Sequence, residues 1–163
     1  MNLAVMGTGA IGGYIGARLA ISGVDVTFIA RGAHLAAIRT AGLRILSPLG
    51  DVHVTHAAAT EDPAGVGPVD VVLMGTKLYD VEAAARAIAP MLGDDTAVIC
   101  LQNGVDATAI VARLHGQAHA IGSVVMINGE IVAPGVIKHN AMNALTWANW
   151  TGARADGWSA SWR

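Results

Sequence analysis

The chain of 163 residues contains a single cysteine, Cys100, and therefore cannot form an internal disulfide. Cys100 lies in the apolar run formed by residues 97–101, where we expect a small buried core residue rather than a nucleophile. This cysteine usage is typical of a reducing compartment, so the sequence predicts a cytoplasmic protein.

Charged residues are also scarce, at 13% of the chain, and the formal net charge is −2. Such a chain has no basic field to attract nucleic acid, so we expect no nucleic-acid partner. Hydrophobic residues make up 53% of the sequence, which predicts a folded globular protein. The length gives room for one ordinary domain with a core of its own.

Long uninterrupted apolar runs are absent as well. The first thirty residues are very apolar, but Arg18, Asp25 and six glycines by position 23 interrupt them. No run is long enough to span a bilayer, and no basic segment precedes the apolar start. We therefore expect neither a signal peptide nor a membrane partner. The chain shows no internal repeat and no low-complexity tract.

Residues 7–12, Gly-Thr-Gly-Ala-Ile-Gly, directly follow the apolar run of residues 3–6. A strand that leads through G-x-G-x-x-G into a helix is typical of a dinucleotide-binding turn. The three glycines allow, in order, a tight turn, close approach of the pyrophosphate, and close packing of helix on strand. The positive end of the helix would hold the pyrophosphate. The predicted cofactor-binding residues here are Gly7, Thr8, Gly9, Ala10, Ile11 and Gly12.

Strand and helix signals alternate along the chain, which predicts a Rossmann-type, doubly wound, mostly parallel α/β sheet with helices on both faces. The expected strands are residues 2–6, 25–29, 43–47, 52–56, 69–74, 96–101 and 118–127, with two short strands in 130–139 around a Pro134-Gly135 turn. The expected helices are residues 10–22, 32–41, 80–92 and 106–115, with Asp80 as a plausible N-cap. Residues 61–68 are expected to form a loop.

The end of the second strand usually distinguishes NAD from NADP binding. An acidic residue there would bind the ribose 2′-hydroxyl, whereas an arginine accommodates a 2′-phosphate. Residues 28–32, FIARG, contain no acid, so Arg31 predicts NADP(H) as the cofactor. The alternative is a solvated arginine at a strand end. His34 could add a donor, although a surface histidine is the simpler interpretation.

Polar residues follow the next two buried strands. Lys77, one of two lysines in the chain, follows the strand expected at residues 69–74, after Gly75 and Thr76. Gln102-Asn103-Gly104 follows the strand after that. Ligands bind at the carboxyl ends of strands in open α/β sheets, so Lys77 and Asn103 are candidate cofactor- and substrate-binding residues. The alternatives are a lysine that extends into solvent and an ordinary Asn-Gly turn.

Metal-ligand patterns are weak. His53 and His56 flank a short expected strand, and no cysteine or carboxylate cluster accompanies them. Solvent-facing histidines explain this spacing better than a metal site, so none is predicted.

Several blocks together resemble a known family. They are GTGAIGGYIGARLA at 7–20, VTFIARGAHLAAIRTAGLRI at 26–45, VDVVLMGTKLYD at 69–80, LQNGVD at 101–106 and VAPGVIKH at 132–139. In combination and spacing they resemble the N-terminal NADP-binding domain of ketopantoate reductase (2-dehydropantoate 2-reductase). The resemblance covers residues 1–140, which we expect to form that domain.

The resemblance implies an oxidoreductase that reduces 2-dehydropantoate to pantoate with NADPH, on the route to pantothenate and coenzyme A. It implies that residues 7–12 hold the pyrophosphate and that Arg31 meets the 2′-phosphate. Lys77 and Asn103 would line the nicotinamide and substrate side of the cleft. The segment after Gly122 approaches the cofactor in the family, which adds Asn128 as a candidate cofactor-binding residue.

In the family, the proton donor is a lysine on a separate C-terminal helical domain that also binds substrate. Lys77 and Lys138 both lie in the nucleotide-binding part, so we expect no catalytic residue in this chain. The expectation is a truncated form that lacks the helical domain, binds cofactor and turns over poorly or not at all. An apolar face where the second domain would pack could drive non-native self-association.

Residues 141–163 are expected to be a tryptophan-rich tail. The four tryptophans are Trp147, Trp150, Trp158 and Trp162, and residues 147–151 suit neither a helix nor a strand of this fold. The single tryptophan codon lets a shifted reading frame be inferred, and that frame gives Gly-(Glu)-Leu-Asp, a motif that the family has near this point. We therefore predict a frameshift between about His139 and Trp147 and an out-of-frame or disordered end. The alternative is a genuine docking segment, since tryptophans anchor interfaces.

Two other functions stay open from the sequence. One is a non-catalytic NADP-binding module that recruits a partner through its tail. The other is the nucleotide domain of a 6-phosphogluconate-type or glycerol-3-phosphate-type dehydrogenase, which Gln102-Asn103-Gly104 and the Pro134-Gly135 turn disfavour.

Overall fold

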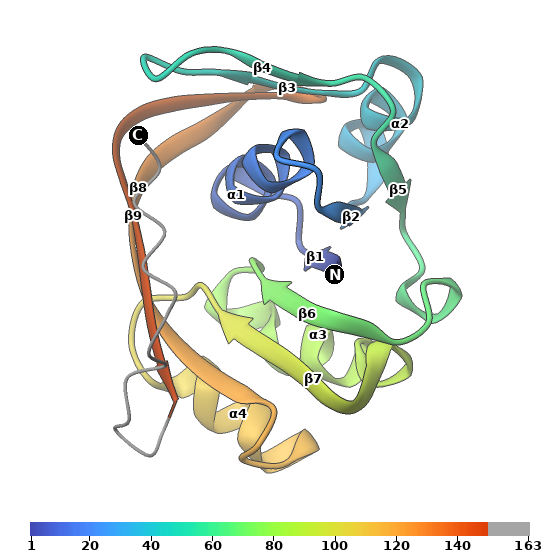
Figure 1. Cartoon of the computed structure of the whole chain (residues 1–163), viewed down its shortest axis with the longest axis vertical. Coiled ribbons are helices and arrows are strands. Elements are labelled where there is room, and N and C mark those ends of the chain that lie inside the picture. Colours follow the sequence, from blue (N-terminus) through green and yellow to red (C-terminus); the bar gives the residue numbers. More distant parts are fainter. Residues whose placement is uncertain (150–163) are drawn as a thin grey trace.

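The computed structural model describes residues 1–149, which form one mixed nine-stranded sheet with helices on both faces (Figure 1). The strand order across the sheet is β4-β3-β9-β8-β7-β6-β1-β2-β5. The strands are β1 (Asn2–Met6), β2 (Asp25–Ile29), β3 (Leu43–Leu46), β4 (Val52–Val54), β5 (Ala58–Thr60), β6 (Val69–Met74), β7 (Leu92–Cys100), β8 (Ala120–Ala133) and β9 (Val136–Asn149). The α-helices are α1 (Ala10–Ile21), α2 (Gly32–Ala41), α3 (Val81–Ala87) and α4 (Asp106–His115), and short 3₁₀ turns are η1 (Pro63–Gly65), η2 (Leu78–Asp80) and η3 (Ala89–Met91).

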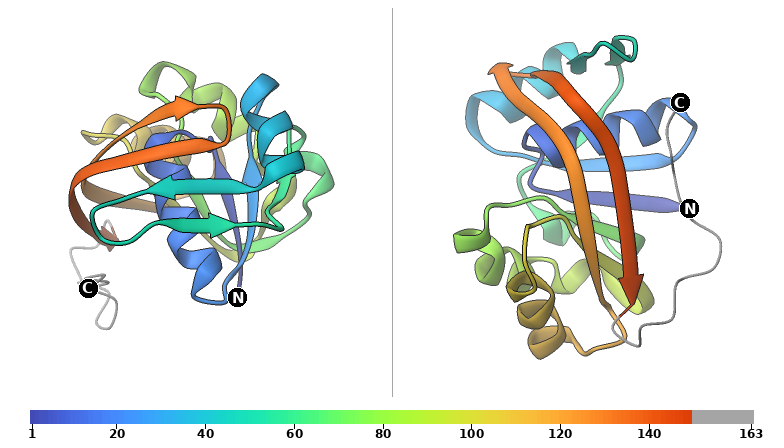
Figure 2. Two further views of the ribbon diagram at one scale, coloured as in Figure 1. Left: turned by 90° about the horizontal axis from the view of Figure 1, so that it is seen from above. Right: turned by 90° about the vertical axis from the view of Figure 1, so that its left-hand side faces the viewer.

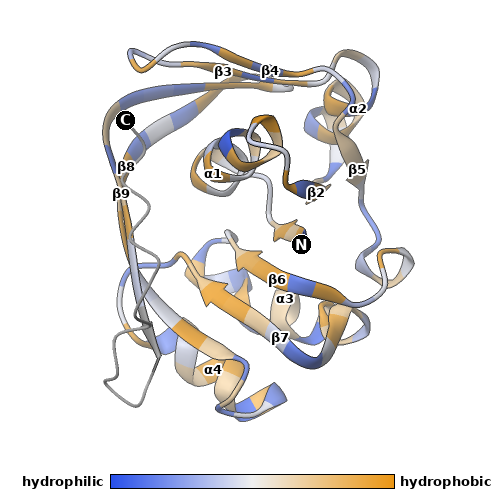
Figure 3. Cartoon of the chain, viewed as in Figure 1, coloured by the Kyte–Doolittle hydropathy of each residue, from blue (hydrophilic) through white to orange (hydrophobic). Residues whose placement is uncertain are grey.

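The centre of the sheet is parallel, as the sequence predicts. β1 pairs in parallel with β2 on one side and β6 on the other, and β7 continues from β6. Alternate residues of β1 enter two separate cores: Leu3 and Val5 pack under α1 and α2, whereas Ala4 and Met6 pack on the α3 and α4 side. Figure 3 shows the hydrophobic residues concentrated along β6 and β7, as expected for strands covered on both faces. The prediction of a doubly wound sheet is confirmed.

The β8–β9 pair carries the sheet around α1. From β7 it curves past one side of α1 to meet β3, which pairs with β9 in parallel (Figures 1 and 2). Tyr14 and Ile137, from α1 and β9, are both fully buried in the core that this wrapping encloses. A Cβ at Gly13 would meet the terminal methyl group of Ile137, so glycine at position 13 lets α1 pack closely on β9 without displacing that side chain. Helix α1, which follows the glycine turn, is thus flanked by β8 and β9 as well as by the central strands.

The prediction of one helix over residues 80–92 is wrong. The segment divides into η2, α3 and η3, and β7 begins at Leu92 rather than at residue 96. Pro90 explains the break, because proline has no N–H to donate and its ring clashes with the preceding turn. The short strand β5, which pairs with β2, was not predicted because three residues carry too little periodicity.

The C-terminal part of the sheet also differs from the prediction. β8 and β9 are long strands joined at Pro134-Gly135, so the turn is confirmed but the two short strands are not. β9 runs past the expected boundary at residue 140, and Trp147 pairs with Ser123, so the prediction that residues 147–149 form no strand is wrong. Residues 150–163, including the other three tryptophans, lie outside the described residues. Whether that tail is an out-of-frame end or a docking segment therefore stays a prediction.

No helix in residues 1–149 has the length and apolarity needed to cross a bilayer.

Candidate nucleotide-binding site

The glycine turn between β1 and α1 is built by close backbone contacts. Gly7 has a φ of +95°, and a Cβ there would lie 2.8 Å from the backbone nitrogen of Thr76. A Cβ at Gly12 would lie 2.7 Å from the carbonyl oxygen of Gly7. Thr8 fixes the turn from the other side, since its N–H and its hydroxyl both donate to the carbonyl of Ile29 at 2.9 Å. The fold itself therefore requires glycine at positions 7 and 12.

Gly9 has a different role. It is the N-cap of α1 at an ordinary φ of −82°, and no atom lies within 4 Å of the position a Cβ would take. The first N–H groups of α1 have no partner within the helix, its first turn has no acidic residue, and no side chain caps it. The open space in front of Gly9 therefore meets a positive helix end, which is the arrangement that binds a diphosphate.

Two adjoining cavities extend from this turn in opposite directions along the carboxyl edge of the sheet. The larger has a volume of about 550 Å³ and the smaller about 290 Å³. Both are lined by Gly9, Gly75, Thr76 and Lys77. Their common boundary is therefore the glycine turn and the segment after β6, and together they offer a groove that suits a two-part ligand joined by a diphosphate.

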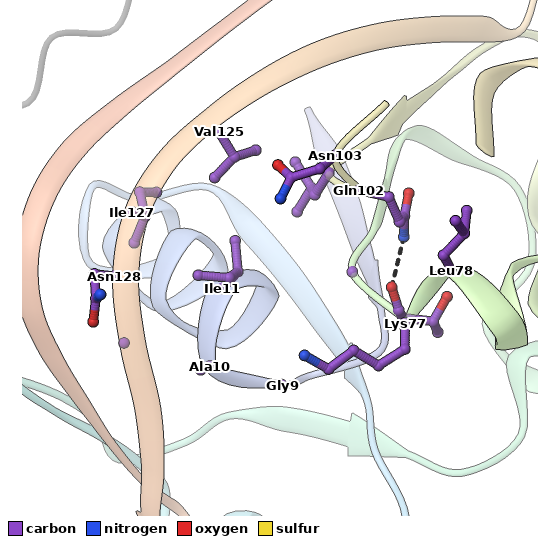
Figure 4. Close-up of a pocket in the computed structure, with 14 residues that line it drawn as sticks. Gly9, Ala10, Ile11, Lys77, Leu78, Gln102, Asn103, Val125, Ile127 and Asn128 are labelled. Atoms are coloured by element: carbon purple, nitrogen blue, oxygen red, sulfur yellow. Dashed lines mark hydrogen bonds between the residues drawn. The ribbon is translucent and has the colours of Figure 1, made fainter. Parts of the chain in front are cut away.

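The larger cavity combines apolar walls with a few polar groups (Figure 4). The apolar walls are Ile11, Leu101, Val125 and Ile127. Lys77 extends its ammonium toward Gly9 and Ala10, and Asn103 points into the space between β7 and β8 (Figure 4). The structure thus brings Lys77 and Asn103 to one cavity. Small-molecule sites combine apolar walls with polar groups that fix the orientation of the ligand, as this cavity does.

Asn128 lies at the rim of this cavity. Its side chain is on the other side of the β8 ribbon from Ile127 (Figure 4), and its Oδ1 accepts a 3.3 Å hydrogen bond from Asn140. The cofactor-binding role of Asn128 stays a prediction.

The smaller cavity is lined by Arg31, His34 and Asp80 as well as the glycine turn. Arg31 is the N-cap residue of α2, and its side chain is exposed beside this cavity. Asp80 precedes α3, but its side chain makes no capping hydrogen bond there. Asp80 instead lines the same cavity as Arg31, a placement that no local sequence signal indicated.

His34 is more than a surface histidine. Its Nδ1 accepts a 3.0 Å hydrogen bond from the backbone N–H of Gly135 in the β8–β9 turn. Burial lowers the pKa of His34, and an interaction with the Thr8 backbone opposes that effect. The ring therefore stays neutral and connects α2 with the β8–β9 turn beside the smaller cavity.

The remaining titratable candidates are structural. Cys100 is buried, and burial raises the pKa of its thiol to about 11, so the prediction of a core cysteine is confirmed. The His53 ring contacts the carbonyl of Ala41 at 2.8 Å. Within residues 1–149, no group of three or more His, Cys, Asp or Glu residues could hold a metal ion.

The family model of ketopantoate reductase PanE/ApbA matches residues 3–152 of the chain. The protein belongs to the ketopantoate reductase family. Its curated relatives include the 2-dehydropantoate 2-reductase of Mesorhizobium japonicum, which is 36% identical over 160 residues that cover 85% of this chain and 49% of the relative. The chain spans about half the length of the curated relatives that it matches.

Solved structures of 2-dehydropantoate 2-reductases superpose closely on this chain. Superposition on the 2-dehydropantoate 2-reductase of Porphyromonas gingivalis W83 gives a TM-score of 0.87 at 35% identity, over 96% of this chain and 57% of the other. The 2-dehydropantoate 2-reductase of Geobacter metallireducens also gives 0.87, at 32% identity, over 91% of this chain and 49% of the other. The predicted family and Rossmann-type fold are both confirmed.

Proposed function

We propose that this chain binds NADPH and forms the nucleotide-binding part of a 2-dehydropantoate 2-reductase. One observation carries the proposal: the open space in front of Gly9 lies at an uncapped helix start and between two cavities. A diphosphate bound there would accept hydrogen bonds from the first N–H groups of α1. Each half of the dinucleotide would then occupy one cavity.

The adenosine half would lie in the smaller cavity, beside Arg31. A guanidinium can donate two hydrogen bonds to one phosphate, so Arg31 would favour the 2′-phosphate of NADPH over the hydroxyl of NADH. The carboxylate of Asp80 shares that cavity and would repel the same phosphate. The preference for NADPH therefore depends on Arg31 outweighing Asp80.

The nicotinamide half would lie in the larger cavity, where the reduced cofactor supplies a hydride to the ketone carbon of 2-dehydropantoate. Ile11, Val125 and Ile127 would exclude water from the ring. Lys77 and Asn103 would bind the cofactor and the carboxylate or keto oxygen of the substrate from the carboxyl edge of the sheet.

Reduction also requires a proton for the developing alkoxide. By family resemblance the donor is a lysine of a separate helical domain, whereas the lysines of this chain are Lys77 in the loop after β6 and Lys138 in β9. We therefore expect this chain by itself to bind NADPH and to reduce 2-dehydropantoate slowly or not at all.

The test is a fluorescence titration of the purified chain with NADPH and with NADH, followed by an assay of NADPH oxidation with 2-dehydropantoate. We expect saturable NADPH binding, weaker NADH binding and little oxidation. Folded protein that binds neither dinucleotide would refute the proposed function. Oxidation at enzyme-like rates would confirm the reaction but contradict the expected lack of a proton donor.

A further inference from the structure

Gln102 follows Leu101 just after the end of β7 and is 9% exposed. Its side-chain Nε2 donates to two backbone carbonyls, that of Met74 at 2.9 Å and that of Thr76 at 2.8 Å (Figure 4 draws one of these bonds). A reversed amide would turn its oxygen toward both carbonyls, so the contacts fix the orientation of the group. Gln102 therefore joins the end of β7 to the segment after β6.

That segment runs between the two cavities. Gly75 donates its N–H to the carbonyl of Met6 at 2.8 Å, and a Cβ on Gly75 would lie 2.7 Å from the carbonyl oxygen of Gly7. The Thr76 carbonyl that accepts from Gln102 comes immediately before Lys77. Within residues 1–149, no other side chain donates a hydrogen bond to that carbonyl. Lys77 itself is exposed and lines both cavities.

The other end of the same amide is unpaired. Oε1 of Gln102 is buried and has no hydrogen-bond partner among the described residues. A buried acceptor without a partner costs stability, and the two bonds donated by Nε2 oppose that cost. Those two bonds tie the backbone at Met74 and Thr76 to the segment after β7.

We propose that Gln102 is a positioning residue that holds the backbone of residues 74–77 so that the ammonium of Lys77 faces the start of α1. The proposal rests on the proposed binding of NADPH, whose diphosphate would lie there. Gln102 also lines the larger cavity, but both of its donated bonds go to the backbone before Lys77, so its proposed effect on the ligand passes through that lysine. Its contribution should therefore vanish when Lys77 is absent.

The test is a double-mutant cycle on the full chain with Gln102→Met, Lys77→Met and the double variant, read by fluorescence titration with NADPH. Gln102→Met removes both donated bonds without adding charge and should weaken NADPH binding about 10-fold, whereas in the Lys77→Met background it should change binding less than about 2-fold. Gln117→Met, the same change at an exposed glutamine far from the cavities, is the matched control and should bind as wild type.

A second ligand distinguishes loss of the Lys77 position from general damage to the binding site. Adenosine 2′-monophosphate has the phosphate for Arg31 but no diphosphate, so its affinity measured by calorimetry should be the same in wild type and Gln102→Met. If Gln102→Met does not fold, Gln102→Asn replaces it, because the shorter amide cannot reach both carbonyls.

Three outcomes would overturn the inference and leave NADPH binding intact: unchanged NADPH affinity in Gln102→Met, equal losses in both backgrounds, or a parallel loss of adenosine 2′-monophosphate binding. Wild-type chain that binds neither probe would instead refute the proposed function, and this inference with it.

Discussion

The backbone N–H of Gly135 donates a 3.0 Å hydrogen bond to Nδ1 of His34, across 101 positions of the sequence. Because Nδ1 accepts, the neutral ring carries its proton on Nε2, which is buried without a hydrogen-bond partner in residues 1–149. A protonated ring would turn an N–H toward the N–H of Gly135 and lose this bond. Burial accordingly lowers the pKa of His34.

This relationship predicts a pH dependence of stability. Since the pKa of His34 is lower in the folded chain than in the unfolded chain, the unfolded chain binds the extra proton first as the pH falls. The contribution of His34 to the free energy of unfolding is thus fully present above pH 6.5, and it is lost as the pH falls through the pKa of His34 in the folded chain. Urea unfolding between pH 5 and pH 8 should show His34→Asn to be less pH-dependent than wild type.

The matched control is His56→Asn, because His56 is exposed. It should keep the pH dependence of the wild-type unfolding free energy. An equal pH dependence in His34→Asn and wild type would contradict the neutral, buried ring.

Gly9 and Gly12 should respond differently to the same substitution. Gly9→Ala adds a methyl group to open space at an ordinary φ, so the fold should be unchanged while NADPH binding falls about 10-fold or more. Gly12→Ala puts a methyl group 2.7 Å from the carbonyl oxygen of Gly7 and should cost about 1–3 kcal/mol of unfolding free energy. Thermal unfolding and NADPH titration measure the two effects separately.

Gly65→Ala serves as the control, since position 65 is exposed and no atom lies within 4 Å of the place that its new methyl group would take. It should keep both stability and NADPH affinity. Wild-type NADPH affinity in Gly9→Ala would mean that the diphosphate does not lie against Gly9.

Arg31 should select the phosphorylated cofactor. A hydrogen bond to a charged group contributes about 1.5–3 kcal/mol, so Arg31→Ala should weaken NADPH binding about 10- to 100-fold and leave NADH binding nearly unchanged. Arg44→Ala, at an exposed arginine in β3 outside both cavities, is the control. Equal losses for the two dinucleotides would show that Arg31 does not meet the 2′-phosphate.

Asp80 should act in the opposite direction. It lines the same cavity as Arg31 and carries the opposite charge. Asp80→Asn removes repulsion of a 2′-phosphate and should tighten NADPH binding about 2- to 5-fold at low salt, less at high salt. Titrations of NADPH at two ionic strengths measure this, and a weaker affinity in Asp80→Asn would argue that the carboxylate binds the ribose instead.

Cys100 should be unreactive in the folded chain. Burial raises the pKa of its thiol to about 11, although a hydrogen bond with Thr108 opposes this. Reaction with a thiol-specific disulfide reagent at pH 8 should be at least about 100-fold slower in buffer than in concentrated urea. Because the unfolded thiol ionises first, this residue also makes stability fall as the pH rises from about 9 toward 11. Equal reaction rates in both solvents would contradict its burial.

Much of the nucleotide-binding half was predictable because its signals are local. The strand of residues 2–6, the glycine turn and the strand of residues 25–29 lie where the sequence predicts, and the helix after the turn ends one residue early. That Lys77 and Asn103 line one cavity was predictable too, because successive parallel strands end on the same side of a sheet. The break at Pro90 had a local signal that the helical pattern around it obscured.

The sequence by itself determined the turn at residues 7–12, the parallel strands beside it and the family. The turn and each strand depend on residues close together along the chain, and the family is carried by the blocks of sequence themselves. Only the tertiary structure decided that β8 and β9 wrap around α1, that Asp80 and Arg31 line one cavity, and that Gln102 donates to the carbonyl before Lys77. Those arrangements join residues far apart in sequence, and hydrogen bonds and packing across such separations form only when the whole sheet closes around its helix.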